Sequence, residues 1–385
     1  MLQEFTVTII ISVLSSYKCS IQVTNLMMIL RYHSNLIVSR FSSRHNKNGL
    51  KERYVKHIKL EDLKKLFQIF EFKDQIGHGS FGVVVKAIDK STSKQYAIKI
   101  INKYNVSANL QEIHEEIKIL KFVSHPNIIF LDRVYETTKK IYLVFELCGE
   151  TLFNKFKNSS QFAEKITKKL SKQIIDAVIY LHKHDIVHRD IKMENILFAT
   201  NPEDPNDEYF IKLSDFGLSV IKVGAGIKGM MTDRVGTILY MSPEILLDHT
   251  YSELCDEWSI GVIIYTLIFG RYPFHATNKE DLMIKICETE PEYPTKTAGS
   301  DCIDLLKSAL KKDPVERITA LEMSKHPWFG STVQRRKDQT VIDYMKQWKS
   351  EMMTISSSHY SISGIPIVQD ELLTVSDFDV DVLHK

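Results

Sequence analysis

The side chains best suited to chemistry lie in two short segments near the middle of the chain. Residues 188–195 read His-Arg-Asp-Ile-Lys-Met-Glu-Asn, which places a carboxylate (Asp190), a lysine (Lys192) and an amide (Asn195) within six residues. Asp215 follows an apolar run and opens an Asp-Phe-Gly tripeptide. Carboxylate and amide oxygens are hard ligands that suit Mg²⁺. In this order the two segments are highly specific, and they predict a site that handles metal-bound phosphate.

A glycine-rich segment, residues 77–84, has the pattern G-x-G-x-x-G-x-V. Glycine lets backbone N–H groups approach phosphate oxygens closely, so a hairpin lying over phosphates is one interpretation. A dinucleotide-binding fold also uses such a loop, but it needs a helix directly afterwards, and residues 83–89 have the composition of a strand. The segment alone does not decide between a phosphate-covering hairpin and an ordinary turn.

Lys99 lies within the apolar strand-like run 96–101. Burying a lysine is costly unless an anion meets it, so we expect a glutamate partner on the helical stretch 110–122. Glu112, Glu115 and Glu116 compete for this position. Glu116 shares the apolar stripe of the helix, whereas Glu115 points about 100° away from it. We therefore expect Glu116 to face inward, and a solvated charge pattern explains the other two.

These segments need two kinds of scaffold. β-branched and aromatic runs at 83–85, 96–101 and 141–145 predict strands, interrupted by the helical stretch 110–122. The spacing of apolar residues also predicts an amphipathic helix over 59–70 and mostly helices over 152–329. A small strand-rich lobe followed by a larger helical lobe is an α+β arrangement.

Composition narrows the function classes. The 385 residues are 44% apolar and 25% charged, which is typical of a globular protein, and the formal net charge is +2. A dedicated nucleic-acid binder would need a basic surplus, so we expect no nucleic-acid partner. The five cysteines are widely spaced and include no C-x-x-C, so we expect neither disulfides nor a zinc site. A reducing compartment fits this pattern, and we expect a cytoplasmic location.

The first thirty residues differ from the rest of the chain. Only Glu4 and Lys18 are charged, and residues 5–14 form an apolar run. A secretory signal needs basic residues before its apolar stretch, and this chain has Glu4 there instead. A membrane-spanning helix needs about 20 apolar residues, and this run is shorter. The low acid content loosely matches a mitochondrial transit peptide. We expect an accessory extension, with a membrane tether as the alternative.

Together these motifs resemble the eukaryotic protein kinases over residues 70–329. Ser-Pro-Glu at 242–244 and Asp-x-Trp-x-x-Gly at 256–261 fit the same pattern. The calcium/calmodulin-dependent kinase group is the most similar, and residues 134–144, 184–190 and 215–227 resemble its serine/threonine kinase 33 subfamily. The resemblance implies a bilobal fold, an N-terminal extension (1–69) and a C-terminal tail (330–385).

The resemblance also assigns roles. The residues implied to bind ATP are Gly77, Gly79, Gly82, Val84, Ala97, Lys99, Glu116, Glu146, Cys148 and Leu197. In the catalytic segment, Asp190 would accept the proton of the substrate hydroxyl and Lys192 would steady the γ-phosphate. Asn195 and Asp215 would hold Mg²⁺. The family's hydrophobic spine would comprise Leu120, Leu131, His188 and Phe216.

The implied activity is serine/threonine phosphorylation of protein substrates. A pseudokinase scaffold is the rival interpretation, although pseudokinases usually lose the lysine, aspartate or Asp-Phe-Gly residues that this chain keeps. Glu194 favours basic substrates, but Thr266 replaces a glutamate found in some basophilic kinases. The resemblance also implies a buried ion pair between Glu244 and Arg317.

Two further regions carry regulatory hypotheses. Asp233 stands near the position where the family usually has a phosphorylatable threonine. It could pair with Arg189 and partly order the loop, since a carboxylate carries less charge than a phosphate. Alternatively, Thr232 takes the phosphate. In the tail, residues 341–353 predict a helix that either binds calmodulin or packs on the C-terminal lobe.

Overall fold

The computed structural model describes residues 53–79, 82–103, 110–222, 231, 235–249 and 251–330. The expectations for the N-terminal extension before residue 53, including its membrane or targeting role, lie outside these residues. So do the calmodulin-binding helix at 341–353 and the pairing of Asp233 with Arg189. They stay predictions, as does the cytoplasmic location. Within the described residues, no helix combines the length and the apolar character needed to cross a membrane.

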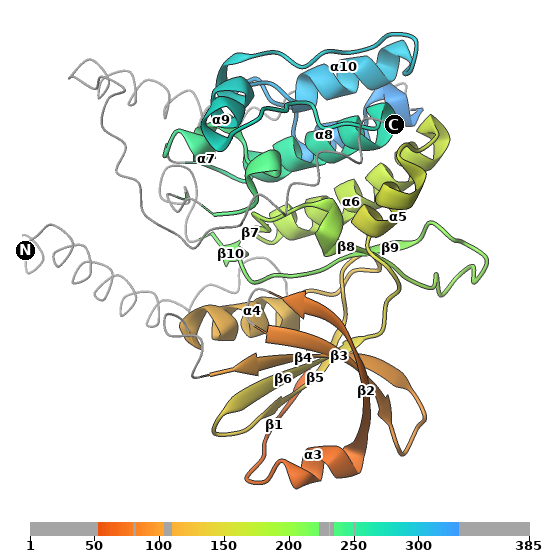
Figure 1. The fold of residues 1–385 in the computed structure, drawn as a ribbon, viewed down its shortest axis with the longest axis vertical. Coiled ribbons are helices and arrows are strands. Elements are labelled where there is room, and N and C mark those ends of the chain that lie inside the picture. The colour runs from red at the N-terminus through yellow and green to blue at the C-terminus, as the bar shows by residue number, and fades with distance from the viewer. Residues whose placement is uncertain are drawn as a thin grey trace, which may run out of the picture. The chain divides into compact units, whose positions relative to one another are not determined.

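The N-terminal lobe is built on one six-stranded sheet with strand order β1-β5-β6-β4-β3-β2 (Figure 1). Its strands are β1 (Lys56–Lys59), β2 (Phe70–Gly79), β3 (Gly82–Asp89), β4 (Gln95–Asn102), β5 (Leu131–Glu136) and β6 (Lys140–Glu146). All neighbours are antiparallel except β1, which runs parallel to β5. Helix α4 (Leu110–Phe122) buries its apolar stripe together with Glu116, as its sequence predicts.

The helix predicted over 59–70 is wrong in its extent. Helix α3 spans only Lys64–Ile69, and Leu66 is its one buried residue. Residues 56–59 pair with β5, with Lys59 opposite Glu136, and Phe70 already belongs to β2. Strand pairing therefore overrides the helical pattern only at the two ends of the predicted span, and residues 60–63 are neither helix nor strand. As a result, the segment 53–69, expected to belong to the extension, packs onto the N-terminal lobe.

The C-terminal lobe is mostly helical. Its α-helices are α5 (Leu152–Ser159), α6 (Glu164–Lys183), α7 (Pro243–Leu246), α8 (Leu254–Phe269), α9 (Lys279–Glu288), α10 (Ser300–Ala309) and α11 (Ala320–Ser324). Every residue of α8 from Leu254 to Ile268 is buried. A helix that is apolar on all sides needs neighbours all round, and α8 packs against both α6 and α10 (Figure 1).

Short strands and turns of 3₁₀ helix link these helices. Two small antiparallel two-stranded sheets pair β7 (Ile186–Val187) with β10 (Val220–Ile221), and β8 (Ile196–Phe198) with β9 (Ile211–Leu213). The 3₁₀ turns are η1 (Met193–Asn195), η3 (Ile238–Tyr240) and η4 (Pro327–Phe329). The chemistry-bearing segments 188–195 and 215–217 lie between strands of these two sheets. The predicted α+β arrangement of a strand-rich and a helical lobe is confirmed.

Candidate active site

The glycine-rich segment forms a hairpin between β2 and β3, in which Gly79 pairs with Gly82. A strand follows the glycines, so a dinucleotide-type loop that opens a helix is excluded. Gly82 is required by its surroundings, because a Cβ atom there would lie 2.0 Å from the carbonyl oxygen of Ile100. Gly77 has more room, with the Cβ of Val84 3.9 Å from where its own would be.

A buried cluster of charges connects the two lobes. The Lys99 Nζ lies 2.9 Å from Glu116 Oε1 and 3.3 Å from Asp215 Oδ1. Of the three glutamates that could meet Lys99, it is the inward-facing Glu116 that does so. The second oxygen of that carboxylate, Oε2, has no hydrogen-bond partner among the described residues. The cluster thus brings together α4, β4 and the Asp-Phe-Gly segment.

Electrostatics keeps this cluster ionised. Burial by itself would lower the pKa of Lys99, but the carboxylates of Glu116 and Asp215 outweigh it and raise that pKa. Burial would likewise raise the pKa of Asp215, and the Lys99 ammonium reverses this and lowers it. Asp215 is therefore a carboxylate at neutral pH. A charged oxygen donor in a partly dry site suits a hard cation.

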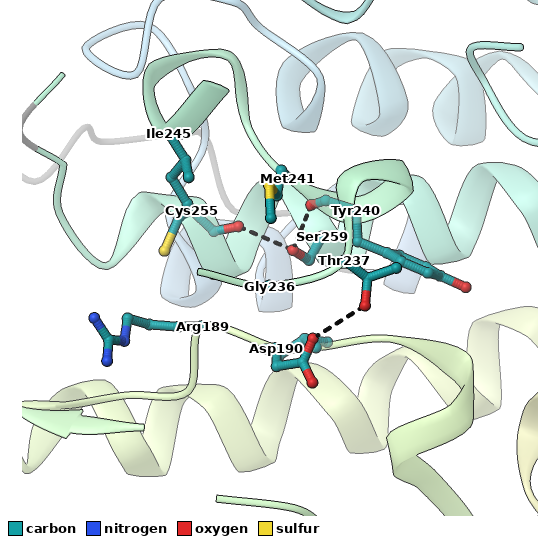
Figure 2. A pocket seen from close by; sticks show the side chains of 10 residues that line it. Arg189, Asp190, Gly236, Thr237, Tyr240, Met241, Ile245, Cys255 and Ser259 are labelled. Atoms are coloured by element: carbon teal, nitrogen blue, oxygen red, sulfur yellow. Dashed lines mark hydrogen bonds between the residues drawn. The ribbon is translucent and has the colours of Figure 1, made fainter. Parts of the chain in front are cut away.

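The catalytic segment brings three polar side chains together. Asp190 Oδ2 lies 2.9 Å from the Lys192 Nζ and accepts a hydrogen bond of 3.0 Å from the Asn195 Nδ2. Thr237 donates to Asp190 Oδ1 at 3.5 Å (Figure 2). The same hydroxyl accepts from Lys192 at 3.0 Å. The cavity beside this group, lined by Gly236 and Tyr240 among others, has about 10 Å³, room for about one water molecule.

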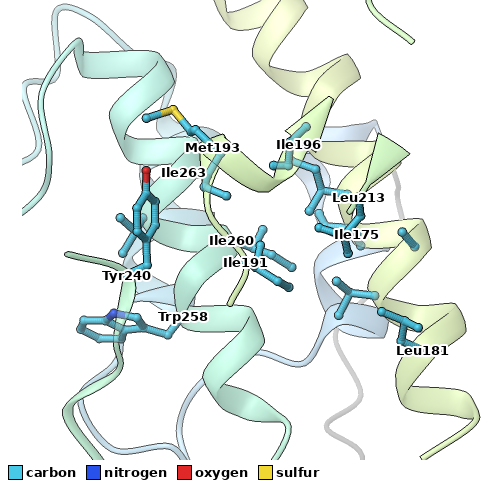
Figure 3. Packing of buried hydrophobic residues seen from close by; sticks show 14 of the residues in the cluster. Ile175, Leu181, Ile191, Met193, Ile196, Leu213, Tyr240, Trp258, Ile260 and Ile263 are labelled. Carbon is cyan, nitrogen blue, oxygen red and sulfur yellow. The ribbon is translucent and has the colours of Figure 1, made fainter. Parts of the chain in front are cut away.

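Buried side chains hold this segment from beneath (Figure 3). Ile191, Met193 and Ile196, in the segment and at the start of β8, are buried in a hydrophobic core cluster that includes residues of both lobes. The labelled residues that face them from helices and strands are Ile175, Leu181, Leu213, Tyr240, Trp258, Ile260 and Ile263. Because the interiors of proteins are close-packed, these contacts also fix Asp190, Lys192 and Asn195, which lie between the buried residues in the sequence.

Two residues of the site have strained backbones, one beside Asp190 in the sequence and the other Asp215 itself. Arg189 has φ of 68° and Asp215 has φ of 58°, both in the left-handed region. Such strain persists only where the surroundings impose it, and it is common at active sites. The carboxylate of Asp256 accepts hydrogen bonds of 2.9 Å from the backbone N–H groups of both His188 and Arg189. This carboxylate therefore holds the catalytic segment in its bent conformation.

Asp256 itself is held by His182, whose Nε2 lies 2.9 Å away, and Glu257 approaches the other ring nitrogen. Burial alone would lower the pKa of His182, but the two carboxylates raise it to about 10. Burial would raise the pKa of Asp256, and the hydrogen bond from His182 lowers it. Sequence reasoning gave Asp256 no role, although its place in the Asp-x-Trp-x-x-Gly pattern was a usable signal.

The four spine residues are all buried. Leu120 and Leu131 are 1% and 0% exposed, and the rings of His188 and Phe216 lie 4.9 Å apart. His188 Nε2 also makes a 3.1 Å hydrogen bond with the carbonyl oxygen of Ser214, next to Asp215. The Asp-Phe-Gly segment therefore packs against the catalytic segment, with Phe216 turned into the core.

The residues expected around an adenine ring come from both lobes. Val84 and Ala97 are half-buried on β3 and β4, and Leu197 is half-buried on β8. Glu146, at the end of β6, uses its carboxylate elsewhere, since it accepts from the Phe130 N–H at 2.8 Å and pairs with Lys212 at 3.0 Å. Both contacts use one carboxylate oxygen, Oε1.

Cys148 follows in the segment between the lobes. Burial raises the pKa of its thiol to about 12. The thiol is therefore neutral at physiological pH and unsuited to nucleophilic attack.

The Arg189 side chain, next to Asp190 in the sequence, donates to the Leu218 carbonyl oxygen at 2.6 Å and to the Tyr251 hydroxyl at 3.2 Å.

The donor set fits a magnesium ion shared with a substrate. The Asn195 Nδ2 is committed to Asp190, which directs the amide oxygen elsewhere. In the described part of the chain, no three His, Cys, Asp or Glu residues are grouped so as to hold a metal by themselves. Mg²⁺ commonly takes one or two protein oxygens and completes its shell with phosphates and water. Asn195 and Asp215 could supply that protein share.

Comparison with known proteins agrees with this geometry. The sequence model of the protein kinase domain matches residues 70–329. Serine/threonine-protein kinase 33 of Mus musculus is 40% identical over 304 residues, which are 77% of this chain and 62% of that protein. Calcium-dependent protein kinase 5 of Plasmodium berghei is 40% identical over 274 residues, 70% of this chain and 47% of that protein.

The chain thus spans about three fifths of the first relative's length and about half of the second's. The domain match covers well over half of the chain itself and includes both lobes, the glycine hairpin and the catalytic segment. On this match and the geometry of the site, the chain belongs to the protein kinase family.

Proposed function

We propose that this chain is a serine/threonine kinase, which transfers the γ-phosphate of Mg²⁺·ATP to hydroxyl groups of protein substrates. One observation carries the proposal, namely that polar residues far apart in the sequence converge. Lys99 of the N-terminal lobe lies 3.3 Å from Asp215, while Asp190 lies 2.9 Å from Lys192 and 3.0 Å from Asn195. Phosphoryl transfer depends mainly on such positioning and charge neutralisation.

Each side chain then has a chemical task. Asp190 stands where it would orient a substrate hydroxyl and accept its proton, and Thr237 lies beside it at 3.5 Å. Lys192 would steady the γ-phosphate, and Lys99, fixed by Glu116, would contact the α- and β-phosphates. Bound Mg²⁺ would neutralise phosphate charge, held by the side-chain oxygens of Asn195 and Asp215. The glycine hairpin would cover the phosphates with its backbone N–H groups.

Glu194 gives this proposal a substrate preference. Burial raises the pKa of its carboxyl, and Oε2 has no hydrogen-bond partner among the described residues. That oxygen is itself buried and out of a substrate's reach, so the preference rests on the family resemblance at Glu194. Thr266 is uncharged, and its buried hydroxyl donates to the carbonyl oxygen of Val262 at 2.7 Å. We therefore propose a moderate preference for basic substrates.

The pseudokinase alternative has no observation in its favour. Lys99 makes both of its ion pairs, Asp190 is held by Asn195, and the Asp-Phe-Gly segment packs against His188. A scaffold that has lost catalysis would not need to keep these contacts together. The names of both relatives call them kinases, and one is named a serine/threonine kinase.

An array of Ser-, Thr- and Tyr-containing peptides tests the proposal. Wild-type protein with Mg²⁺ and γ-labelled ATP is expected to label Ser and Thr peptides, and the Asp190→Asn variant to label none. The matched control is Asp176→Asn, which alters an aspartate on the exposed side of α6. Labelling confined to tyrosine, no labelling by wild type, or equal labelling by Asp190→Asn would overturn the proposal.

A further inference from the structure

The segment that precedes the matched kinase domain is anchored at the C-terminal end of α4. The backbone N–H of Arg53 donates to the carbonyl oxygen of Lys121 at 2.9 Å. Its guanidinium Nη2 donates to the carbonyl oxygens of Leu120 at 3.2 Å and Leu131 at 2.8 Å. One residue thus binds two carbonyls in the last turn of α4 and one at the start of β5.

Further contacts fix this anchor. The Arg53 guanidinium lies over the ring of Phe130, with its carbon 3.8 Å from the ring centre. Two residues later, Val55 is 7% exposed and belongs to the same core cluster as Leu120. β1 then continues along β5 for four paired residues. The anchor is therefore a packed part of the N-terminal lobe and not a loose flanking segment.

Physical chemistry explains why an arginine suits this position. The last carbonyls of a helix have no partner within the helix, and a cation there also complements the helix dipole. A guanidinium is planar, so it can donate within its plane to two carbonyls while its face stacks on an aromatic ring. Both hydrogen bonds leave one nitrogen, Nη2, so a lysine ammonium could still donate to carbonyls but would lose the stacking of a planar group on Phe130.

The two carbonyls that accept from the Arg53 guanidinium belong to Leu120 and Leu131. The side chains of Leu120 and Leu131 are buried members of the hydrophobic spine. Glu116, the partner of Lys99, precedes Leu120 by four residues and lies on the same face of α4. A shift of α4 against β5 at Arg53 would therefore also move Glu116 relative to Lys99 on β4.

We propose that Arg53 is a positioning residue for phosphoryl transfer, which fastens α4 to β5 and so keeps Glu116 on Lys99. The proposal rests on the proposed kinase function. Arg53 is not among the residues placed around the nucleotide, and it acts through the contact that it makes between α4 and β5. Residues 53–59 are thus a working part of the N-terminal lobe, although they lie outside the residues matched by the domain model.

The test compares full-length wild type with Arg53→Ala, Arg53→Lys and the control Lys56→Ala, an exposed position on β1. Two quantities are measured: kcat and KM for ATP, and hydrogen exchange of the α4 amides relative to those of α8. For Arg53→Ala we expect kcat/KM for ATP to fall about tenfold, equivalent to about 1.4 kcal/mol, with faster exchange in α4 and unchanged exchange in α8. Arg53→Lys should give kcat/KM and α4 exchange rates between those of wild type and Arg53→Ala. Lys56→Ala should match wild type in both quantities.

Several outcomes would overturn the proposal. Wild-type kinetics and α4 exchange in Arg53→Ala would show that the anchor is dispensable. Equal acceleration of exchange in α4 and α8 would show a role in overall stability only. If Arg53→Ala does not fold, Arg53→Lys decides alone, and wild-type exchange in its α4 contradicts the proposal. If wild type transfers no phosphate, the kinase function fails, while the exchange measurement still tests the anchor itself.

Discussion

Replacing Arg317 by alanine is expected to destabilise the C-terminal lobe strongly. The Arg317 side chain is 0% exposed and forms a double ion pair with Glu244, at 2.6 Å and 2.8 Å. It also donates to the carbonyl oxygens of Leu254 and Lys311, and it lies over the ring of Trp258. The substitution would leave a buried carboxylate and several carbonyls without a partner.

The magnitude follows from the loss of one partner in a buried pair, which costs about 3–5 kcal/mol. In domains of this size, 1 kcal/mol shifts the unfolding midpoint by about 2–4 °C, so the midpoint should fall by roughly 6–20 °C. Thermal unfolding of purified full-length protein measures this, and soluble yield should fall with it. Activity per folded molecule, assayed well below the midpoint, should change less.

A matched control is available on the surface. Arg271 pairs with Glu292 at 2.8 Å, but the two side chains are 39% and 79% exposed. Exposed pairs contribute about 0–1 kcal/mol, so Arg271→Ala should shift the midpoint by a few degrees at most. If Arg317→Ala and Arg271→Ala unfold at the same temperature, the reasoning about burial is refuted. A double variant, Glu244→Leu with Arg317→Met, should recover part of the loss.

Two further predictions concern the site's supports. Gly82→Ala should lower the unfolding midpoint, because its Cβ would meet the Ile100 carbonyl oxygen at 2.0 Å, whereas Gly77→Ala has 3.9 Å of room and should lower it less; equal midpoints in thermal unfolding would contradict this. The pKa of His182 is raised to about 10, so its stabilising contribution is full below pH 6.5 and is lost as pH rises towards 10. Urea unfolding should therefore show the gap between wild type and His182→Gln shrinking from pH 6 to pH 10, and a constant gap would count against the ion pair.

The sequence predicted contacts among the candidate site residues better than the elements that support them. Asp190, Lys192 and Asn195 are local in sequence, so their contacts follow from one short motif. Glu116 could be selected because helical spacing places it, unlike Glu115, on the apolar face of α4. In both cases neighbours along the chain set the local placement of the side chain, whereas the contacts of Lys99 with Glu116 and Asp215 depend on tertiary packing.

What could not be predicted depends on partners distant in sequence. Residues 56–59 became β1 because β5, more than seventy residues later, offered an edge to pair with. The apolar spacing over 59–70 fits a helix, yet in α3 only Leu66 is buried, while Leu63 and Phe67 are exposed. Arg53 carried no local signal at all, since its role exists only where α4 and β5 meet.

The central claim is that the converged residues carry out phosphate transfer, and the rate of transfer by Asp190→Asn tests it most directly. The measurement is the initial rate of γ-phosphate transfer to the best peptide substrate, at saturating Mg²⁺·ATP, with Asp176→Asn as the control. Loss of a positioned general base costs about 10²–10⁴-fold in rate, so we predict a fall of that size with an unchanged unfolding midpoint. A rate for Asp190→Asn within a few fold of wild type would contradict the account.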